Sequence, residues 1–302
     1  MSNDAVQITF DWDNSVWFFD VDDTLINTAD LIKPAAEGML PLLTHSLGPE
    51  KATALKQRFI EIFDLLLIGH RMKTGETWSS SQLETAHQQL VENIKSHQEV
   101  LLSEGIFKKW SRQVWLKQAA VDLGIELDPE LNLLAVQAYW DELARQTQLL
   151  TGVPELFTEL KHRGYPVFLV TGSDAHLHFN DNLQFIYDPV RSEHIKQQRV
   201  LPLRELGLDF HDLVIGDPID KPHRGFFEKA VEVAKDHLHP NLDPQHFVIV
   251  GDSYGSDLHV PRTELDFGLV VEIVPGQQNL TMIDSQHLAT GNLATLINLL
   301  PR

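Results

Sequence analysis

The sequence predicts a doubly wound α/β fold, a parallel sheet with helices on both faces, that carries an inserted all-helical domain. Three observations support this fold class. Short apolar runs alternate with helical segments after Gly152. A strand-like run near the N-terminus, Val16–Phe19, ends abruptly in acidic residues. Between these two regions, from about residue 30 to residue 150, the chain has an almost uninterrupted helical texture.

The first strand is expected at Val16–Phe19, an apolar run rich in aromatic residues that leads into a polar loop at residues 20–24. The helical region follows. Asp128 and Pro129 are typical of the N-cap and first position of a helix. Amphipathic periodicity predicts helices over Ala52–Leu67, Ser80–Leu102, Phe107–Leu123 and Leu131–Leu149.

After Gly152 the pattern changes to alternating strands and helices. Strands are expected at Pro166–Val170, Leu213–Ile215, Phe247–Val250 and Leu269–Val274. A helix is expected over Pro154–Arg163 and ends at Gly164, and another helix ends at Leu203–Gly207. Two more helices are expected over Gly225–His237 and Ala289–Leu300. Because such alternation requires crossover connections, these strands predict a parallel sheet with right-handed crossovers. We therefore expect an α/β core of residues 1–30 and 151–302, and a helical insert of residues 31–150.

Composition narrows the classes of function. The chain of 302 residues is 43% hydrophobic and 22% charged, as in ordinary globular proteins. Its net charge of −19 disfavours nucleic acid as a partner. It contains no cysteine, so disulfides, thiolate metal sites and a cysteine nucleophile are excluded. No apolar stretch is long enough for a membrane helix, and the acidic start lacks a secretory signal pattern. We expect a cytoplasmic protein without a membrane partner and leave its oligomeric state open.

Polar residues follow four of the predicted strands: Asp20 and Asp22, Thr171, Asp217 with Lys221 nearby, and Asp252 with Asp257. A single aspartate after a strand is usually a turn residue or a helix cap, but four such strand ends in order are harder to explain in that way. In open α/β sheets ligands bind at the carboxyl ends of the strands. Carboxylates gathered there suit a hard cation such as Mg²⁺ and a substrate phosphate.

The order of these segments resembles the haloacid dehalogenase-like (HAD) hydrolase superfamily, most of whose members are phosphatases. Its first and fourth motifs are specific: Asp-x-Asp-x-Thr after a strand, at Phe18–Leu25, and Gly-Asp-x-x-x-x-Asp after a strand, at Val248–Asp257. The second and third, a strand ending in threonine at Val167–Thr171 and a lysine before proline within Gly216–Pro222, add weight by their order. The resemblance covers the core, implies a Rossmann-like fold, and makes the insert a helical cap by its position.

The resemblance implies a role for each motif residue. Asp20 is the expected nucleophile, which forms an aspartyl-phosphate, and Asp22 the expected general acid and base. Two positions along an extended chain bring both side chains to the same face. Thr171 and the backbone at Gly172 are expected to bind the phosphoryl group, and Lys221 to supply a compact positive charge.

The expected cofactor is Mg²⁺, held by the Asp20 side chain, the Asp22 backbone carbonyl and Asp252. Asp257 is expected near the metal, where it orients a metal-bound water or Lys221.

Three segments leave alternatives open. Asp23 stands where the family often has glycine; we interpret it as a turn residue rather than a metal ligand, because aspartate tolerates a left-handed backbone. The stretch Asp174–Gln197 is either a surface elaboration or part of the substrate entrance, and a metal site at its His176-x-His178 pair is disfavoured. The basic segment Gly69–Trp78 is either a specificity loop or an ordinary helix end.

The sequence therefore predicts a Mg²⁺-dependent phosphomonoester hydrolase that acts on a small phosphorylated metabolite. A phosphomutase or phosphotransferase of the same superfamily is an alternative, and so is a non-catalytic binding protein that retains the fold. Dehalogenation is disfavoured, because Asp22 supplies an acid for an oxygen leaving group.

Overall fold

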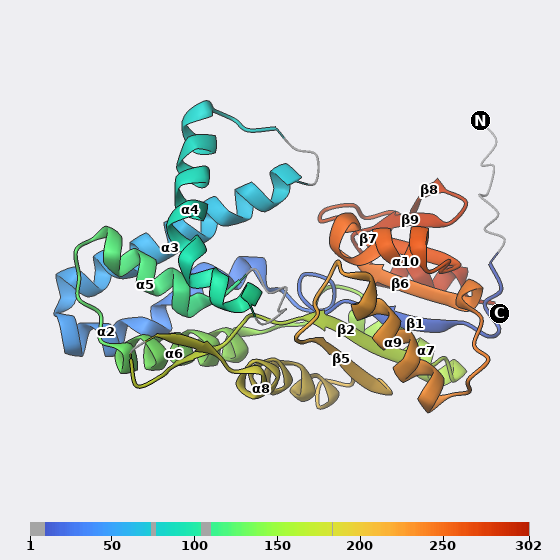
Figure 1. Cartoon of the computed structure of the whole chain (residues 1–302). Helices are drawn as coiled ribbons and strands as arrows, with labels where there is room; N and C mark the ends of the chain where they lie inside the picture. Colours follow the sequence, from blue (N-terminus) through green and yellow to red (C-terminus); the bar gives the residue numbers. More distant parts are fainter. Residues whose placement is uncertain (1–9, 74–76, 104–109, 183, 302) are drawn as a thin grey trace. The chain divides into compact units, whose positions relative to one another are not determined.

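A computed structural model describes residues 10–73, 77–103, 110–182 and 184–301. Its residues group into two compact units (Figure 1). The α/β unit consists of the described residues of Met1–Ala29, Gln148–Gly172 and Gln197–Arg302. The helical unit consists of those of Asp30–Thr147 and Ser173–Lys196.

The α/β unit contains a seven-stranded sheet with the order β5-β2-β1-β6-β7-β9-β8. All neighbours in the sheet are parallel except β8, which runs antiparallel to β9. The strands are β1 (Val16–Phe19), β2 (Val167–Gly172), β5 (Asp212–Gly216), β6 (Phe247–Gly251), β7 (Leu269–Ile273), β8 (Thr281–Asp284) and β9 (His287–Thr290). This mostly parallel sheet with flanking helices confirms the predicted fold class.

Alternation along β1 shows why the sheet is covered on both faces. Trp17 and Phe19 belong to one apolar cluster, with residues of α7 (Val153–Arg163). Phe18 belongs to a second cluster on the other face, with residues of α9 (Arg224–His237). Because successive side chains of a strand point to opposite faces, a strand that is apolar throughout must be buried on both sides.

Shorter elements complete the α/β unit. They are η3 (Leu201–Arg204), η4 (Pro244–His246), η5 (Tyr254–Leu258), α10 (His259–Glu264) and η6 (Leu293–Leu299). The short η1 (Ala29–Leu31) begins at the last residue of the first segment of the α/β unit and continues among residues of the helical unit. Helix α8 (Pro189–Val200) begins among the residues of the helical unit and ends among those of the α/β unit.

The helical unit is built around a buried aromatic cluster that includes Phe59, Trp115 and Tyr139. As expected, Asp128 caps a helix: its side chain accepts a hydrogen bond from the backbone N–H of Leu131 at 3.1 Å. The unit's elements are α1 (Ile32–Ala35), η2 (Ala36–Met39), α2 (Leu40–Leu47), α3 (Pro49–Lys73), α4 (Ser81–Ser103), α5 (Arg112–Asp122) and α6 (Pro129–Gln146), with a hairpin of β3 (Leu177–Phe179) and β4 (Phe185–Tyr187).

Two segments differ from the expectations. Residues 173–196, assigned above to the core, group with the helical unit, because Leu177, Phe185 and Tyr187 of the hairpin are buried in its apolar cluster. The helix expected over Ala289–Leu300 is wrong at its start, since β9 occupies His287–Thr290 and only a 3₁₀ helix follows. Short buried apolar runs do not distinguish a strand from a helix by periodicity.

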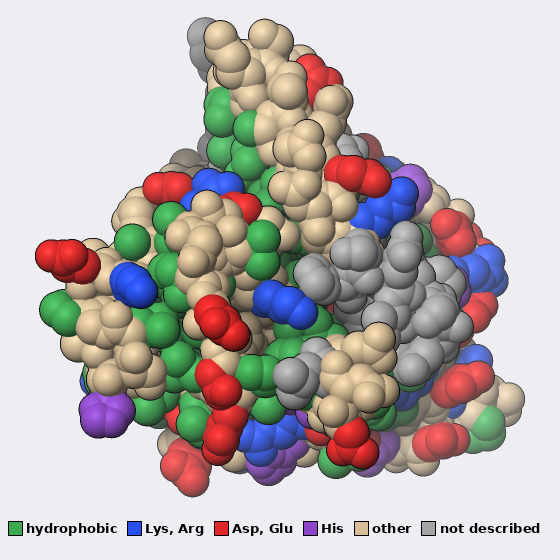
Figure 2. Space-filling view, turned by 60° about the vertical axis from the view of Figure 1, so that its left-hand side comes forward, with side chains coloured by type: hydrophobic (Ala, Val, Ile, Leu, Met, Phe, Trp, Pro, Cys, Tyr) green, Lys and Arg blue, Asp and Glu red, His purple; other side chains and the backbone are tan. Residues whose placement is uncertain are grey.

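The distribution of acidic side chains and the hydropathy of the helices agree with the composition of the sequence. Figure 2 shows one face of the molecule on which acidic side chains are scattered among hydrophobic and polar ones. Among the described residues, no helix is both long and apolar enough to cross a bilayer.

Candidate active site

The candidate site lies in the α/β unit, where β1 ends. Asp20 follows the last residue of β1, and its backbone N–H donates to the carbonyl of Val250 in the neighbouring strand β6 at 2.9 Å. This bond continues the parallel pairing in which Phe19 is opposite Val250. The register thus fixes Asp20 beside the end of β6, from which the fourth motif begins.

Lys221 joins two of the predicted acidic residues. Its Nζ donates to Asp20 Oδ1 at 2.6 Å and to Asp257 Oδ1 at 2.9 Å. All three side chains are buried, with exposed fractions of 7%, 8% and 4% for Lys221, Asp20 and Asp257. Burial lowers the pKa of Lys221, but the two carboxylates outweigh that effect and raise it, so the ammonium stays charged.

The fourth motif returns Asp257 to the end of β6 through a tight loop. The Asp257 backbone N–H donates to the carbonyl of Ser253, and the Ser253 N–H donates to Asp257 Oδ2 at 3.0 Å. A side chain at position 251 would place its Cβ only 2.5 Å from the Asp257 Cβ. Gly251 is therefore required for the close approach of this carboxylate to the strand.

The carboxylates crowd one another. Oxygens of Asp20, Asp252 and Asp257 all lie within 4.8 Å of each other. Burial raises the pKa of Asp20 to about 7 against the opposing effect of Lys221, and repulsion from Asp257 and Asp22 adds to the rise. For Asp252, which is exposed at the surface unlike Asp20 and Asp257, desolvation of the carboxylate by its neighbours and then repulsion from Asp257 and Asp20 raise the pKa to about 9. Such crowding of like charges favours a bound cation.

The donor set fits a divalent metal. Within the part of the chain that the structure describes, this trio is the only group of three such residues that could hold a metal ion. All of its potential ligand atoms are carboxylate oxygens, the ligand type of Mg²⁺. Lys221 neutralises only part of the charge of three carboxylates.

Asp22 is held by two residues that the sequence analysis did not single out. Arg199 Nη1 donates to Asp22 Oδ1, and Thr28 Oγ1 donates to the same oxygen at 2.7 Å. Thr28 lies six residues after Asp22, within the first motif's loop, and could have been found from that proximity. Arg199 is 177 residues away and has no local motif, so only the tertiary structure places it here.

Asp23 acts in the turn. Its backbone is left-handed, with φ of 57°, and its Oδ1 accepts from the backbone N–H groups of Thr28 and Ala29, both at 2.8 Å. These contacts close the loop that carries Asp22. Among the described residues, the Asp23 side chain does not belong to the group of carboxylates that could hold a metal ion.

Thr171 and Gly172 end β2 at the same edge of the sheet. Thr171 is fully buried and pairs in register with Ile215 of β5. A Cβ at Gly172 or Gly216 would lie 2.9 Å or 2.2 Å from Asp220 Oδ1. The two glycines thus admit Asp220 against the strand ends, and its carboxylate accepts from the Lys221 N–H at 2.7 Å. The Thr171 hydroxyl donates to the Gly172 carbonyl at 3.3 Å.

Other candidate residues lie apart from the acidic cluster. Within the helical unit, His176 Nδ1 lies 2.8 Å from Gln113 Nε2, and His178 Nδ1 lies 3.9 Å from Asp188 Oδ2. Neither histidine belongs to a metal-type group among the residues described. Most of the basic segment 69–78 lies outside the residues whose side chains are described.

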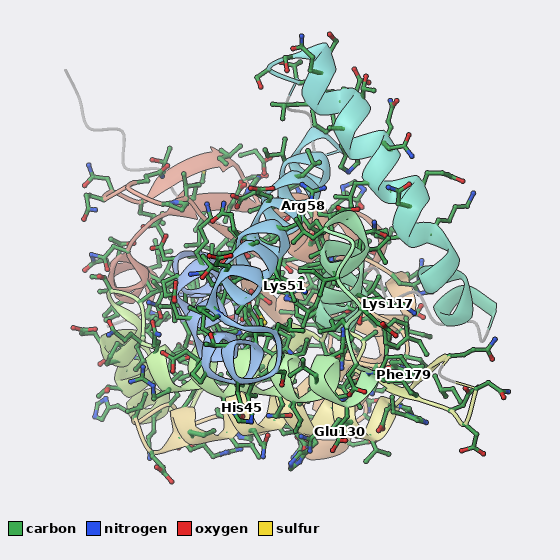
Figure 3. All side chains as sticks on the ribbon, turned by 90° about the vertical axis from the view of Figure 1, so that its left-hand side faces the viewer. His45, Lys51, Arg58, Lys117, Glu130 and Phe179 are labelled. Carbon is green, nitrogen blue, oxygen red and sulfur yellow. The ribbon has the colours of Figure 1, made fainter. Side chains whose placement is uncertain are left out.

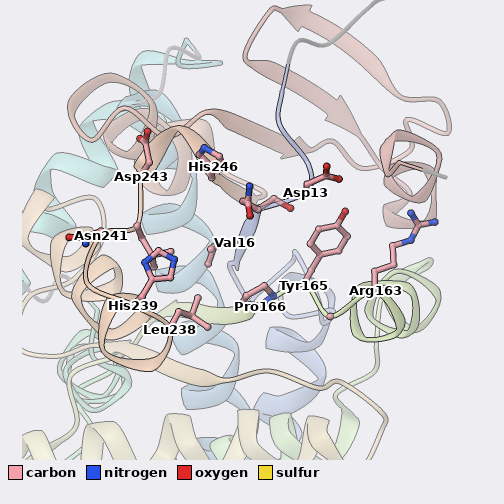
Figure 4. A pocket seen from close by; sticks show the side chains of 14 residues that line it. Asp13, Val16, Arg163, Tyr165, Pro166, Leu238, His239, Asn241, Asp243 and His246 are labelled. Atoms are coloured by element: carbon pink, nitrogen blue, oxygen red, sulfur yellow. The ribbon is translucent and has the colours of Figure 1, made fainter.

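Two of the pockets formed by the described residues each lie within a single unit, and neither of these two contains a predicted site residue. One, of about 530 Å³, belongs to the helical unit and includes Lys117 and Phe179, both labelled in Figure 3. The other, of about 440 Å³, is lined by Val16 and Pro166 at the starts of β1 and β2 (Figure 4). It therefore lies at the edge of the sheet opposite the acidic cluster.

Comparisons with solved structures agree with this fold. The chain resembles the putative HAD-hydrolase YfnB of Bacillus subtilis, bound to magnesium, at 18% identity and a TM-score of 0.53, over 95% of this chain and 99% of that one. It resembles a putative β-phosphoglucomutase of Thermotoga maritima at 13% identity and a TM-score of 0.52, over 95% of this chain and 98% of that one. A 2-haloacid dehalogenase of Pseudomonas syringae pv. Tomato DC3000 matches at 19% identity and a TM-score of 0.50, over 95% of this chain and 97% of that one.

No curated protein sequence matches the chain. At these identities the solved structures support the fold alone, and they include proteins named for different reactions. A family model, described as haloacid dehalogenase-like hydrolase, matches residues 16–259 and so spans both the acidic cluster and the inserted helices. The chain therefore belongs to the haloacid dehalogenase-like hydrolases.

Proposed function

We propose that this HAD hydrolase is a Mg²⁺-dependent phosphatase that cleaves a small phosphomonoester through an aspartyl-phosphate on Asp20. One observation carries the proposal: Asp20, Asp252 and Asp257 gather at the strand ends with the buried ammonium of Lys221. This arrangement can receive a phosphoryl group, because cationic groups offset the repulsion between a carboxylate nucleophile and an anionic ester.

The chain's own residues supply the steps. An oxygen of Asp20 attacks phosphorus, and the bond from phosphorus to the leaving oxygen breaks. Asp22 gives a proton to that oxygen and later takes one from the water that hydrolyses the acyl phosphate. Lys221, 2.6 Å from Asp20, stabilises the negative charge that develops on the transferring group. Thr171 and the backbone at Gly172 are proposed to hold its oxygens.

Asp20, Asp252 and the Asp22 carbonyl would hold Mg²⁺, and Asp257 would keep Lys221 in place. When bound, the metal supplies positive charge that screens the phosphate and stabilises the transition state.

The presence of Asp22 favours a phosphate ester over a haloacid as the substrate. An alkoxide leaving group needs a proton, whereas a halide leaves without one. Asp22 is held in place by Arg199 and Thr28, as expected for a residue that must address one leaving oxygen.

The test is phosphate release from a panel of small phosphomonoesters with and without Mg²⁺, for the wild type and Asp20→Asn. We expect metal-dependent release that Asp20→Asn lowers by at least about 1,000-fold, as for loss of other nucleophiles. Asp209→Asn, which changes an exposed carboxylate paired with Lys161, is the matched control and should keep full activity.

The panel also includes 2-chloropropionate and, as a phosphoryl acceptor, a sugar monophosphate. Chloride release without phosphate release would replace the proposal with dehalogenation. Phosphoryl transfer to the sugar without release would replace it with a mutase. No turnover by a protein that binds Mg²⁺ would favour a binding role.

A further inference from the structure

Two arginines are buried among the residues that the structure describes, and one of them, Arg199, lies beside the first motif. It occupies the last turn of α8, and 5% of its side chain is exposed. Removing a guanidinium from water is costly unless its donors are paired. The identity of its partners therefore indicates what the residue is for.

Arg199, Thr28 and Asp22 form a closed hydrogen-bonded triangle. Arg199 Nη1 donates to Asp22 Oδ1, and Nη2 donates to Thr28 Oγ1 at 2.6 Å. The Thr28 hydroxyl then donates to Asp22 Oδ1 at 2.7 Å. All three residues belong to the α/β unit.

The direction of these bonds follows from chemistry. A guanidinium carries only donors, so the Thr28 oxygen must be the acceptor of the Arg199 bond, and its own hydrogen is free to point at Asp22. Asp22 Oδ1 therefore faces two donors. A proton on Oδ1 would point at the guanidinium of Arg199, which can only donate, so this contact favours Oδ2 as the oxygen that carries the proton.

We propose that Arg199 is a positioning residue that, with Thr28, fixes the Asp22 carboxyl group so that Oδ2 exchanges the proton with the leaving oxygen. This inference rests on the proposed phosphatase function and goes beyond it. In the first step the O–H bond on Oδ2 breaks as the leaving oxygen gains the proton and the electron pair of its bond to phosphorus. In the second step a water proton returns to Oδ2 as the water oxygen bonds to phosphorus and the Asp20 bond breaks.

A plain structural tie between α8 and the motif loop is the competing explanation. The two differ in how activity depends on the leaving group. p-Nitrophenolate leaves without protonation, whereas the alkoxide of glycerol phosphate requires it. General acid catalysis contributes about 100- to 10,000-fold in enzymes. Because kcat/KM covers the steps up to formation of the aspartyl-phosphate, a defect confined to proton donation lowers it only for the poor leaving group.

The experiment compares kcat/KM for glycerol phosphate and p-nitrophenyl phosphate in the wild type, Arg199→Ala and Thr28→Val. We expect Arg199→Ala to lower the value for glycerol phosphate by at least about 10-fold and that for p-nitrophenyl phosphate by less than about 3-fold. Thr28→Val keeps the shape of the side chain and removes its hydroxyl, so it should give the same pattern with a smaller loss. If Arg199→Ala does not fold, Thr28→Val decides the matter alone.

A double-variant cycle separates action through Asp22 from any other action. In an Asp22→Asn background, adding Arg199→Ala should change the activity on glycerol phosphate by less than about 3-fold. Arg163→Ala is the matched control, since Arg163 pairs with Glu159 on α7 at the far edge of the sheet. It should leave both substrates unaffected.

Equal losses on the two substrates, or an undiminished loss in the Asp22→Asn background, would overturn the positioning role while leaving the phosphatase function intact. A wild-type protein that hydrolyses neither ester nor any other member of the panel would overturn both.

Discussion

The two units of the molecule each bury one arginine against an aspartate, and they satisfy it in different ways. In the helical unit, Arg112 pairs with Asp174 at 2.6 Å and lies over four aromatic rings. Its guanidinium carbon is 4.3 Å from the Trp115 ring centroid, with Trp140, Phe63 and Tyr139 at 5.2, 5.6 and 5.8 Å. In the α/β unit, Arg199 donates hydrogen bonds to the Asp22 carboxylate and to the Thr28 hydroxyl.

This difference separates two uses of the same side chain. A guanidinium on aromatic faces is held mainly by packing and cation–π attraction, and it acts as part of the core. A guanidinium that directs its donors to a carboxylate and a hydroxyl in a motif loop fixes the geometry of those groups. We therefore expect Arg112 to matter for stability and Arg199 for the reaction.

Replacing Arg112 tests the stability side of this comparison and has the largest expected effect. Arg112→Ala should lower the free energy of unfolding by about 3–5 kcal/mol, because it leaves the part-buried Asp174 without its partner and removes a cation from the aromatic cluster. Urea unfolding followed by circular dichroism measures this. The ratio of activities on glycerol phosphate and p-nitrophenyl phosphate should not change. A ratio that shifts as in Arg199→Ala would remove the distinction between the two arginines.

Metal binding should act on the α/β unit through its acidic cluster. A ligand that binds only the native state at 100 times its Kd stabilises by about 2.7 kcal/mol, so Mg²⁺ should raise the Tm. Asp252→Asn should abolish the rise, since Asp252 belongs to the trio of carboxylates. His176→Gln, in the helical unit, is the control and should keep it. An equal rise in the Asp252→Asn protein would place the metal elsewhere.

Asp23 tests whether an acidic residue next to the cluster has a turn role. Asp23→Ala loses the acceptor of two backbone N–H groups and leaves alanine in a left-handed backbone, so it should destabilise the protein by about 2 kcal/mol. Asp23→Asn keeps an oxygen acceptor and should cost less. The Mg²⁺-dependent rise in Tm should persist in both variants, and its loss in the asparagine variant would instead make Asp23 a metal ligand.

The pH dependence of stability should have opposite signs in the two units, with a slope of at most about 1.4 kcal/mol per pH unit for one proton. In the metal-free protein the raised pKa values of Asp20 and Asp252, about 7 and about 9, mean that the folded state holds protons which the unfolded state releases. The contribution of these two groups to the free energy of unfolding is complete below about pH 4 and is lost as the pH rises through 7 and 9.

His176 behaves in the opposite way. Burial and the nearby Arg191 lower its pKa to about 4, against the effect of Asp188, so its contribution is present above about pH 6.5 and is lost as the pH falls towards 4. Thermal unfolding in EDTA between pH 4.5 and 9 should show both trends. Asp252→Asn should remove the part of the alkaline decline that continues towards pH 9 and leave the part near pH 7 that comes from Asp20. His176→Gln should remove the acid decline. Curves unchanged by both substitutions would refute these assignments.

The sequence by itself determined the fold class and the acidic motifs. Asp20 and Asp22 follow an aromatic strand, and Gly251 and Asp252 follow a second strand. Both are local patterns, so strand ends and turn residues can be recognised without knowledge of the fold. The turn role of Asp23 was also accessible, because a left-handed backbone is a local property. Roles that depend on metal, substrate and reaction remain proposals.

Only the tertiary structure decided the contacts between distant segments. The triangle of Arg199, Thr28 and Asp22 joins residues 177 positions apart, and residues 173–196 join the helical unit through the burial of their hairpin. Strand β9 was missed because a buried run of four residues has no periodicity that excludes a helix. Local patterns report what each residue prefers, whereas partners across the fold are set by packing and by the need to pair every buried charge.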